Sequence, residues 1–130
     1  MIVVETSALV AIVLGEPEAE RLLDVLVREQ AVLSVASLFE ATLVVEARQG
    51  PDATRDLDLL VDGAVDQVLD VDIDHHRAAL SAWRRFGKGR HPAGLNFGDC
   101  LAYAAARTAG APLLFKGADF PQTDIPAVAY

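Results

Sequence analysis

The sequence has little of what several protein classes require. Cys100 is its only cysteine, so an internal disulfide is impossible and a reducing compartment fits. None of its apolar runs approaches the roughly 20 residues of a membrane-spanning helix. The N-terminus lacks the basic start and the small-residue cleavage site of a secretory signal. We therefore expect a cytoplasmic protein with no membrane segment.

Positive charge is also scarce, because the formal net charge is −8. Such a balance argues against a general nucleic-acid binder. The charges are unevenly distributed, however. Residues 51–76 contain eight aspartates and one basic residue, whereas residues 77–91 contain no acid and five basic residues: Arg77, Arg84, Arg85, Lys88 and Arg90. A basic segment on an acidic protein predicts a local contact with an anion. The alternative is a solvated helix end and loop.

Short apolar runs alternate with helical patterns along the chain. Residues 2–4, 31–33, 68–71 and 112–115 predict short buried strands, and residues 125–128 a weaker fifth. Helical periodicity covers the segments 7–14, 17–29, 36–48, 52–63, 74–86 and 97–109. Glycines and prolines make residues 87–95 a loop. This order predicts one domain over residues 1–130, a three-layer α/β/α sandwich with a mainly parallel central sheet.

Four acidic residues are predicted to meet at one edge of this sheet. Glu5 directly follows the first strand, and Glu40 lies in the helix after the second. Asp119 follows the strand at 112–115, and Asp99 begins the helix that leads into that strand. A helix that runs antiparallel to a strand starts near the strand's carboxyl end, where ligands bind in such folds. All four carboxylates can therefore reach one edge.

Each of these acids also has a structural alternative. Residues 37–40, SLFE, have the spacing of a capping box. Residues 96–99, NFGD, fit an asparagine cap with an acid near the helix dipole. Glu5 can serve only to stabilise the start of the next helix, and Asp119 can be a turn residue. Taken singly, each acid favours the structural interpretation.

Taken together, the four carboxylates favour a metal site. Carboxylates that lie close together repel one another, and their pKa values rise unless a cation neutralises them. Mg²⁺ or Mn²⁺ suits such a site, because it binds few carboxylates, keeps waters and accepts phosphate oxygens. Such an ion activates water and stabilises the leaving oxygen of a phosphodiester. Cys100 and the three histidines lack the spacing of a zinc site. Whether one or two ions bind stays open.

Four segments carry a family resemblance: MIVVETSALVAIVLGEPEAERL, SLFEATLVVEAR, GLNFGDCLAYAAA and LLFKGADFPQTDI. In this order they resemble the PIN-domain ribonucleases, and most of all the VapC-type toxins of bacterial toxin–antitoxin pairs, over nearly the whole chain. The resemblance implies an α/β/α sandwich, an endoribonuclease that depends on Mg²⁺ or Mn²⁺, and a homodimer. It also implies inhibition by a cognate antitoxin, and structured RNA targets such as tRNA or ribosomal RNA.

The resemblance places the catalytic and metal-binding acids at four positions: Glu5, Glu40, Asp99 and Asp119. It gives supporting roles to three polar residues beside them: Thr6, Ser7 and Asn96. The family normally has aspartate where this chain has Glu5, and glutamate reaches about 1.5 Å further. Mg²⁺ tolerates poor geometry badly, so the longer side chain can weaken the site. The alternative function is therefore an impaired module that binds antitoxin and metal without cleaving RNA.

The resemblance also gives the basic segment a function. Four residues precede the loop that leads to Asp99 and are expected to contact RNA phosphates: Arg84, Arg85, Lys88 and Arg90. Few aromatic residues are expected to be free for base stacking. Trp83, at helical spacing from Leu80, is expected in the core.

A phosphate-accepting receiver domain is a second alternative, because it too has an acidic pocket in a parallel sheet. Lys116 after a strand is suggestive of it. That mechanism needs an acceptor aspartate at the end of a central strand, and the candidates Asp70, Asp72 and Asp74 are scattered across a strand end and a helix start. The receiver interpretation is therefore less favoured than the nuclease.

Overall fold

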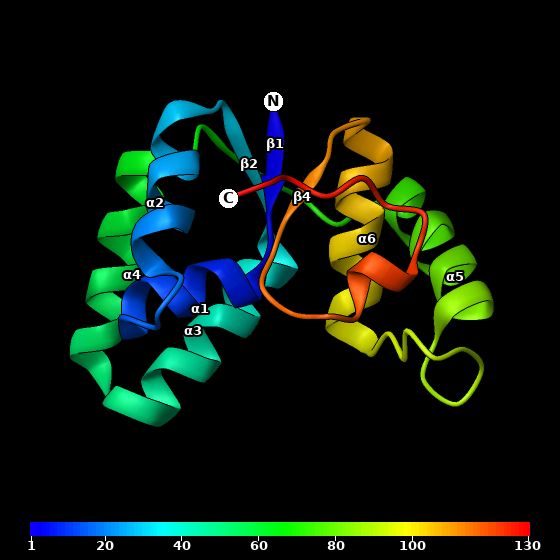
Figure 1. Ribbon diagram of the computed structural model, residues 1–130, viewed down its shortest axis with the longest axis horizontal. Coiled ribbons are helices and arrows are strands. Elements are labelled where there is room, and N and C mark those ends of the chain that lie inside the picture. Colours follow the sequence, from blue (N-terminus) through cyan, green and yellow to red (C-terminus); the bar gives the residue numbers. More distant parts are fainter.

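The structure, a computed structural model, describes residues 1–130 and is built around a four-stranded parallel sheet (Figure 1). In the order β3-β2-β1-β4 the sheet contains β1 (Ile2–Val4), β2 (Ala31–Ser34), β3 (Gln67–Leu69) and β4 (Leu113–Leu114). In the centre of the register, Val3 lies opposite Val32 on one side and Leu113 on the other. Because every pair is parallel, the carboxyl ends of all four strands lie at one edge.

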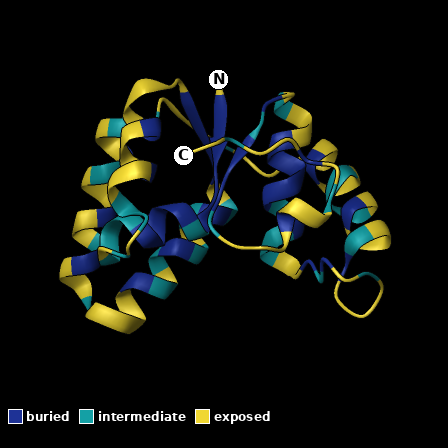
Figure 2. Ribbon diagram, in the orientation of Figure 1, coloured by how far each residue is buried: buried dark blue, intermediate teal, exposed yellow.

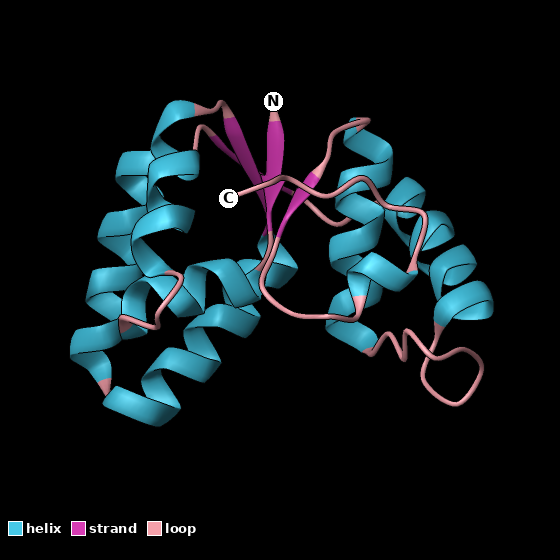
Figure 3. Cartoon of the chain, in the orientation of Figure 1, coloured by secondary structure: helices cyan, strands magenta, loops and turns pink.

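Helices cover both faces of the sheet, which confirms the predicted three-layer α/β/α sandwich (Figure 3). One face carries α1 (Thr6–Leu14), α2 (Ala19–Arg28), α3 (Val35–Gln49) and α4 (Pro51–Ala64). The other carries α5 (Ile73–Phe86) and α6 (Phe97–Ala109). A short 3-10 helix, η1 (Phe120–Gln122), follows β4. None of the helices is long and apolar enough to cross a membrane.

The strands divide the apolar core into two parts, one on each side of the sheet (Figure 2). Ile2 and Val4 pack with the α1–α4 side, and Val3 packs with the α5–α6 side. This alternation follows because successive side chains of a strand point to opposite faces. The expectation that all the strands are buried is wrong for β3, where Gln67 and Val68 are exposed because β3 is an edge strand.

Local sequence signals set the helix ends close to the predicted positions. Gly15 and Gly110 end α1 and α6, with φ values of 67° and 62°, a left-handed conformation that glycine adopts at no steric cost. Ser34 and Asn96 cap α3 and α6, since each side chain accepts a hydrogen bond from a backbone amide of the first turn. Capping and turn chemistry therefore account for these boundaries.

The predicted strand at 125–128 is wrong. This segment makes only an isolated bridge, between Leu113 and Ala127. The Leu113 amide donates to the Pro126 carbonyl at 2.9 Å, and the Val128 amide donates to the Leu113 carbonyl at 3.0 Å. Pro126 itself has no N–H, so the ladder is not continued.

Candidate active site

Glu5 lies at the turn from β1 into α1, with only 4% of its surface exposed. Its Oε2 accepts hydrogen bonds from the Ser7 amide at 2.8 Å and from the Ser7 hydroxyl at 2.5 Å. The pKa of Glu5 rises from 4.5 to about 7: burial is the main cause, the charges of Asp99 and Glu40 add to it, and the bonds from Ser7 oppose it. Near neutral pH, Glu5 is therefore a partly charged group facing two other acids.

Glu40 points from α3 toward α1 and α6. The Thr6 hydroxyl donates to its Oε1 at 2.7 Å and also lies 3.2 Å from the Ser37 carbonyl oxygen. The capping-box alternative for residues 37–40 is wrong, because Ser34 caps α3. The Glu40 side chain is thus bonded to the residue that follows Glu5, and it contributes to the raised pKa of Glu5.

Asp99 has the structural role weighed from the sequence, and its carboxylate also interacts with the charges of two other acids. Its Oδ2 accepts from the Asn96 amide at 3.0 Å, and the Asn96 side chain accepts from the Asp99 amide at 2.8 Å, which completes a capping box at the start of α6. Burial raises the pKa of Asp99, and Glu40 and Asp119 raise it too, against the hydrogen bond from Asn96. The Asp99 carboxylate therefore caps α6 and also interacts with neighbouring acids.

Asp119 lies just before η1 and lines the same hollow as Glu5. The hollow has a volume of about 200 Å³ and is lined by Glu5, Ser7, Asn96, Asp99, Lys116, Gly117, Asp119 and Phe120. Lys116 was not predicted as a site residue, although its position directly after a strand, like that of Glu5, is a usable signal. The Lys116 amide donates to the Ser7 hydroxyl oxygen at 2.8 Å, so the segment after β4 is bonded to the residue that orients Glu5.

The charges of Asp99 and Glu40 raise the pKa of Glu5, and those of Glu40 and Asp119 raise the pKa of Asp99. Glu5, Asp99 and Asp119 line one hollow, which Glu40 does not line. No group of three or more His, Cys, Asp or Glu side chains is arranged to hold a metal ion. The oxygen donors nevertheless suit Mg²⁺ or Mn²⁺, which takes few carboxylates and keeps several waters. A cation would also relieve the repulsion between these carboxylates. The four-acid ligand set stays a prediction.

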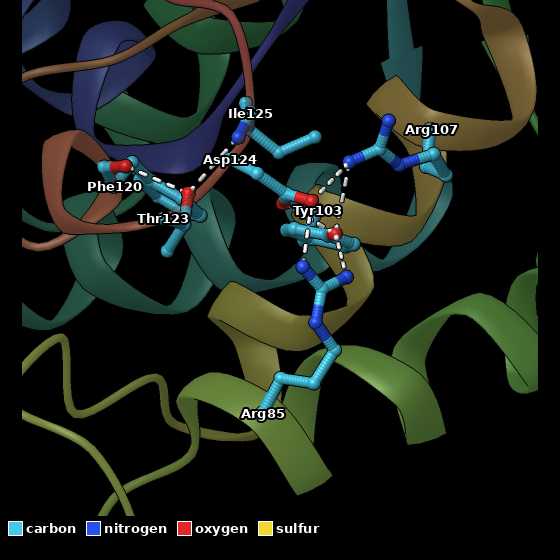
Figure 4. A network of polar contacts seen from close by, with 7 residues as sticks. All are labelled: Arg85, Tyr103, Arg107, Phe120, Thr123, Asp124 and Ile125. Carbon is cyan, nitrogen blue, oxygen red and sulfur yellow. Dashed lines mark hydrogen bonds and ion pairs between the residues drawn. The ribbon is translucent and has the colours of Figure 1, made fainter.

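Arg85 does not line this hollow, and its side chain takes part in a network of polar contacts with Tyr103 and Asp124 (Figure 4). Its guanidinium donates to Asp124 at 2.8 Å and lies 3.4 Å from the Tyr103 hydroxyl. Arg107 also pairs with Asp124, at 3.0 Å, and the Tyr103 hydroxyl donates to the same carboxylate. These contacts raise the pKa of Arg85, chiefly through the hydrogen bond to Asp124. Arg85 therefore bonds the C-terminal segment to α5 and α6.

The other basic candidates are exposed: Arg84, Lys88 and Arg90. The loop 87–95 joins α5 to the start of α6, which carries Asp99, so Lys88 and Arg90 lie on the connection to the acidic edge (Figure 1). The Arg90 guanidinium lies over the Trp83 ring, 4.0 Å from its centre. The expectation that Trp83 is a core residue is wrong, because 43% of it is exposed.

Trp83 lines an apolar hollow between α5 and α6. The hollow has a volume of about 390 Å³ and is lined by Val71, His76, Ala79, Leu80, Trp83, Phe97, Cys100 and Leu101. Phe97 is 84% exposed and also borders a second hollow, on the α3 side, beside Phe39. Exposed apolar surface therefore runs from α5 across the start of α6 to α3.

Comparisons with known proteins agree with this architecture. A family model of the PIN domain matches residues 2–126. Ribonuclease VapC of Mycolicibacterium smegmatis is 50% identical over 128 residues, which cover 97% of this chain and 98% of that protein. Ribonuclease VapC30 of Mycobacterium tuberculosis is 48% identical over 128 residues, which cover 98% of both chains.

Solved structures share the fold at lower sequence identity. VapC20 of Mycobacterium tuberculosis, described as a toxin that cleaves the Sarcin-Ricin loop, superposes with a TM-score of 0.80 at 20% identity over 98% of each chain. A toxin–antitoxin complex from Klebsiella pneumoniae gives a TM-score of 0.74 at 15% identity, over 100% of this chain and 98% of that one. At these identities the likeness shows a common fold.

Proposed function

Because the chain belongs to the PIN-domain family, and within it to the VapC proteins, we propose that it is an endoribonuclease toxin that hydrolyses RNA phosphodiester bonds and is neutralised by a cognate antitoxin. One observation carries the proposal: buried Glu5 faces the charges of Asp99 and Glu40 at the carboxyl edge of the sheet. The relatives named ribonucleases, about half identical over almost their full length, support RNA as the substrate. We propose structured RNA, tRNA or ribosomal RNA, as its class.

The proposed cofactor is Mg²⁺ or Mn²⁺, held by Glu5, Glu40, Asp99 and Asp119. When bound, such an ion supplies an activated water near neutral pH and stabilises the leaving oxygen of a phosphodiester. The chain's own part is to position the carboxylates. Ser7, Thr6 and the Asn96 amide each donate a hydrogen bond to one of them, which restricts its rotamers before substrate binds.

A second candidate function is the impaired module, which binds antitoxin and metal without cleaving RNA. Two features of Glu5 favour it: the extra methylene relative to the family's aspartate, and a pKa of about 7, which leaves the carboxylate only partly charged at neutral pH. A protonated carboxyl is a poor ligand for a hard cation. Whether the chain cleaves RNA therefore depends, in these two candidate functions, on the Glu5 side chain.

The deciding experiment measures RNA cleavage in Mn²⁺ by the unaltered chain, Glu5→Asp and Asp99→Asn. Asparagine keeps a side-chain oxygen for the α6 cap, so Asp99→Asn removes the charge with little effect on the fold. We expect the unaltered chain to cleave and Asp99→Asn to be inactive. Cleavage by Glu5→Asp alone would instead support the impaired module. Equal cleavage by all three proteins would contradict the impaired module and the role of Asp99 as a ligand. No cleavage by any of them would contradict the ribonuclease function.

The proposed partners are a cognate antitoxin and a second copy of the chain, acting in the cytoplasm as a single-domain protein. The structural neighbours that are toxin–antitoxin complexes support the antitoxin. The exposed apolar surface around Phe97 and Phe39 supports a homodimer, because monomers seldom expose large contiguous apolar patches. Light scattering should give a dimer mass for the unaltered chain and a monomer mass for Phe97→Glu. Retained dimers with lost antitoxin binding would assign the surface to the antitoxin.

A further inference from the structure

Lys116 is the only positively charged residue among those that line the acidic hollow, which include Glu5, Asp99 and Asp119. Its place there is set by the backbone, because its amide donates to the Ser7 hydroxyl oxygen at 2.8 Å and Ser7 in turn donates to Glu5. The position of residue 116 relative to Glu5 is therefore independent of the lysine side chain, which is free to serve another purpose.

The Lys116 ammonium is paired with two glutamates of the turn between α1 and α2. Its Nζ lies 2.8 Å from Glu16 Oε1 and 2.8 Å from Glu18 Oε2. Apart from this ion pair, Glu18 Oε2 is buried without a hydrogen-bond partner. Arg48 is the only other cation near these glutamates, at 3.9 Å from Glu16. One ammonium thus bridges two carboxylates, and it belongs to a residue that lines the hollow.

RNA needs positive charge at this hollow, because the carboxylates repel its phosphates. Arg85 is occupied by Asp124, and Arg90 lies over the Trp83 ring. The Lys116 side chain is 36% exposed, so solvent and a phosphate can reach its ammonium while Glu16 and Glu18 hold it. Lysine suits a phosphate as a compact charge on a flexible stem.

Resting on the proposed ribonuclease function, we propose that Lys116 is the residue of this site that binds an RNA phosphate, and that Glu16 and Glu18 restrain it until RNA binds. On binding, the ammonium leaves the glutamates for a phosphate oxygen at the hollow. No covalent bond changes in this step. The glutamates therefore lower the affinity for RNA, and the lysine raises it.

The test uses variants whose effects should have opposite signs. Lys116→Met removes the cation, and Glu16→Gln with Glu18→Gln removes the restraint. Binding of a short fluorescent RNA is measured in EDTA over a range of salt concentrations. We expect Lys116→Met to weaken binding and to reduce the salt slope by about 0.7, the loss of one phosphate contact on a single strand. We expect the double variant to bind severalfold more tightly.

Charge-matched controls separate a local effect from a change in net charge. Arg28→Met removes a positive charge at the end of α2, toward the opposite edge of the sheet, and Asp56→Asn with Asp58→Asn removes two exposed negative charges from α4. If the glutamate variant gains no more affinity than the α4 variant, or if it loses affinity as Lys116→Met does, the ion pairs are only structural and the proposal is wrong. Thermal unfolding of each variant shows whether lost affinity reflects lost fold.

RNA binding and cleavage by the unaltered chain distinguish failure of the Lys116 proposal from failure of the proposed ribonuclease function. A chain that neither binds nor cleaves RNA would overturn the proposed function, and the role of Lys116 with it. If the unaltered chain binds and cleaves RNA, but the Lys116 and glutamate variants change RNA affinity no more than their charge-matched controls, only the role of Lys116 is overturned. In Mn²⁺, Lys116→Met should raise KM for RNA more than it lowers kcat, since the contact is to a bound phosphate.

Discussion

A β-carbon on Gly98 would lie 2.8 Å from the carboxylate carbon of Glu40. The first turn of α6 therefore passes α3 so closely that only hydrogen fits between its backbone and this acid. Gly98 directly precedes Asp99, so the same close approach brings the Asp99 and Glu40 charges near each other, as their interaction in the raised pKa of Asp99 indicates.

Gly98→Ala should displace the Glu40 side chain and lower RNA cleavage by about tenfold or more, the effect of misplacing one group of a catalytic site. Gly63→Ala is the matched control, because Gly63 is also helical and has nothing within 4 Å of its β-carbon position. This control should keep full activity and gain about 0.5–1 kcal/mol in free energy of unfolding. Equal activity in the two variants would show that Glu40 tolerates displacement.

Glu5 should make the free energy of unfolding depend on pH. Its pKa is about 7 in the folded chain against 4.5 for the free side chain, so the folded state holds the proton more tightly. This contribution is complete below pH 4.5 and is lost as the pH rises through 7, and a shift of this size corresponds to about 3–4 kcal/mol at most. Urea unfolding between pH 4.5 and 8 should show a shallower decline for Glu5→Gln. A residual decline is expected from Asp99, whose pKa is raised as well.

Mn²⁺ should stabilise the chain at pH 8 and much less at pH 5, because protons compete for the same carboxylates. At saturating metal, about 100 times the Kd, the gain in free energy of unfolding should be near 2.7 kcal/mol. The measurement is the shift in Tm on adding MnCl₂ at each pH, with Asp99→Asn as the control that loses the shift. A shift of equal size in Asp99→Asn would place the ion elsewhere.

The basic residues at the end of α5 and in the loop after it should have two different roles. Arg84→Ala combined with Lys88→Ala should flatten the salt dependence of RNA binding and leave Tm unchanged, because both side chains are exposed and Arg84 has no ion pair. Arg85→Ala should lower Tm instead, since it removes contacts to Asp124 and Tyr103. A Tm unchanged in Arg85→Ala, together with a flattened salt slope, would return Arg85 to the RNA-binding surface.

Much of the fold could be predicted because its signals are local. The apolar run before Glu5 is a short parallel strand with both faces covered, and Gly110 ends a helix where a left-handed residue is needed. The strand at 125–128 failed because β-branched composition does not reveal that Pro126 and its neighbours meet β4 at a single bridge. The prediction that Trp83 is a core residue was wrong, because helical spacing shows which face of the helix it lies on and does not show whether another element covers that face.

The candidate site was predictable to the level of its acids. Parallel strands share a carboxyl edge, so residues that follow β1, β2 and β4 had to come near one another. The partners of those acids were not predictable. The capping box at residues 37–40, the structural alternative for Glu40, does not form. The hydrogen bond to Glu40 comes from Thr6, 34 positions earlier, because the packing of α1 against α3 brings that hydroxyl to it.

The amino-acid sequence by itself determined the order of strands and helices, the edge of the sheet at which Glu5 and Asp99 lie, and the family, because periodicity, capping and motif spacing are local properties. Only the tertiary structure decided which basic side chains form ion pairs within the chain. Arg85 meets Asp124 across 39 positions, and Lys116 meets Glu16 across 100. Charged side chains pair only with groups within a few ångströms. Residues so far apart in the sequence come that close only when the layers of the fold pack together.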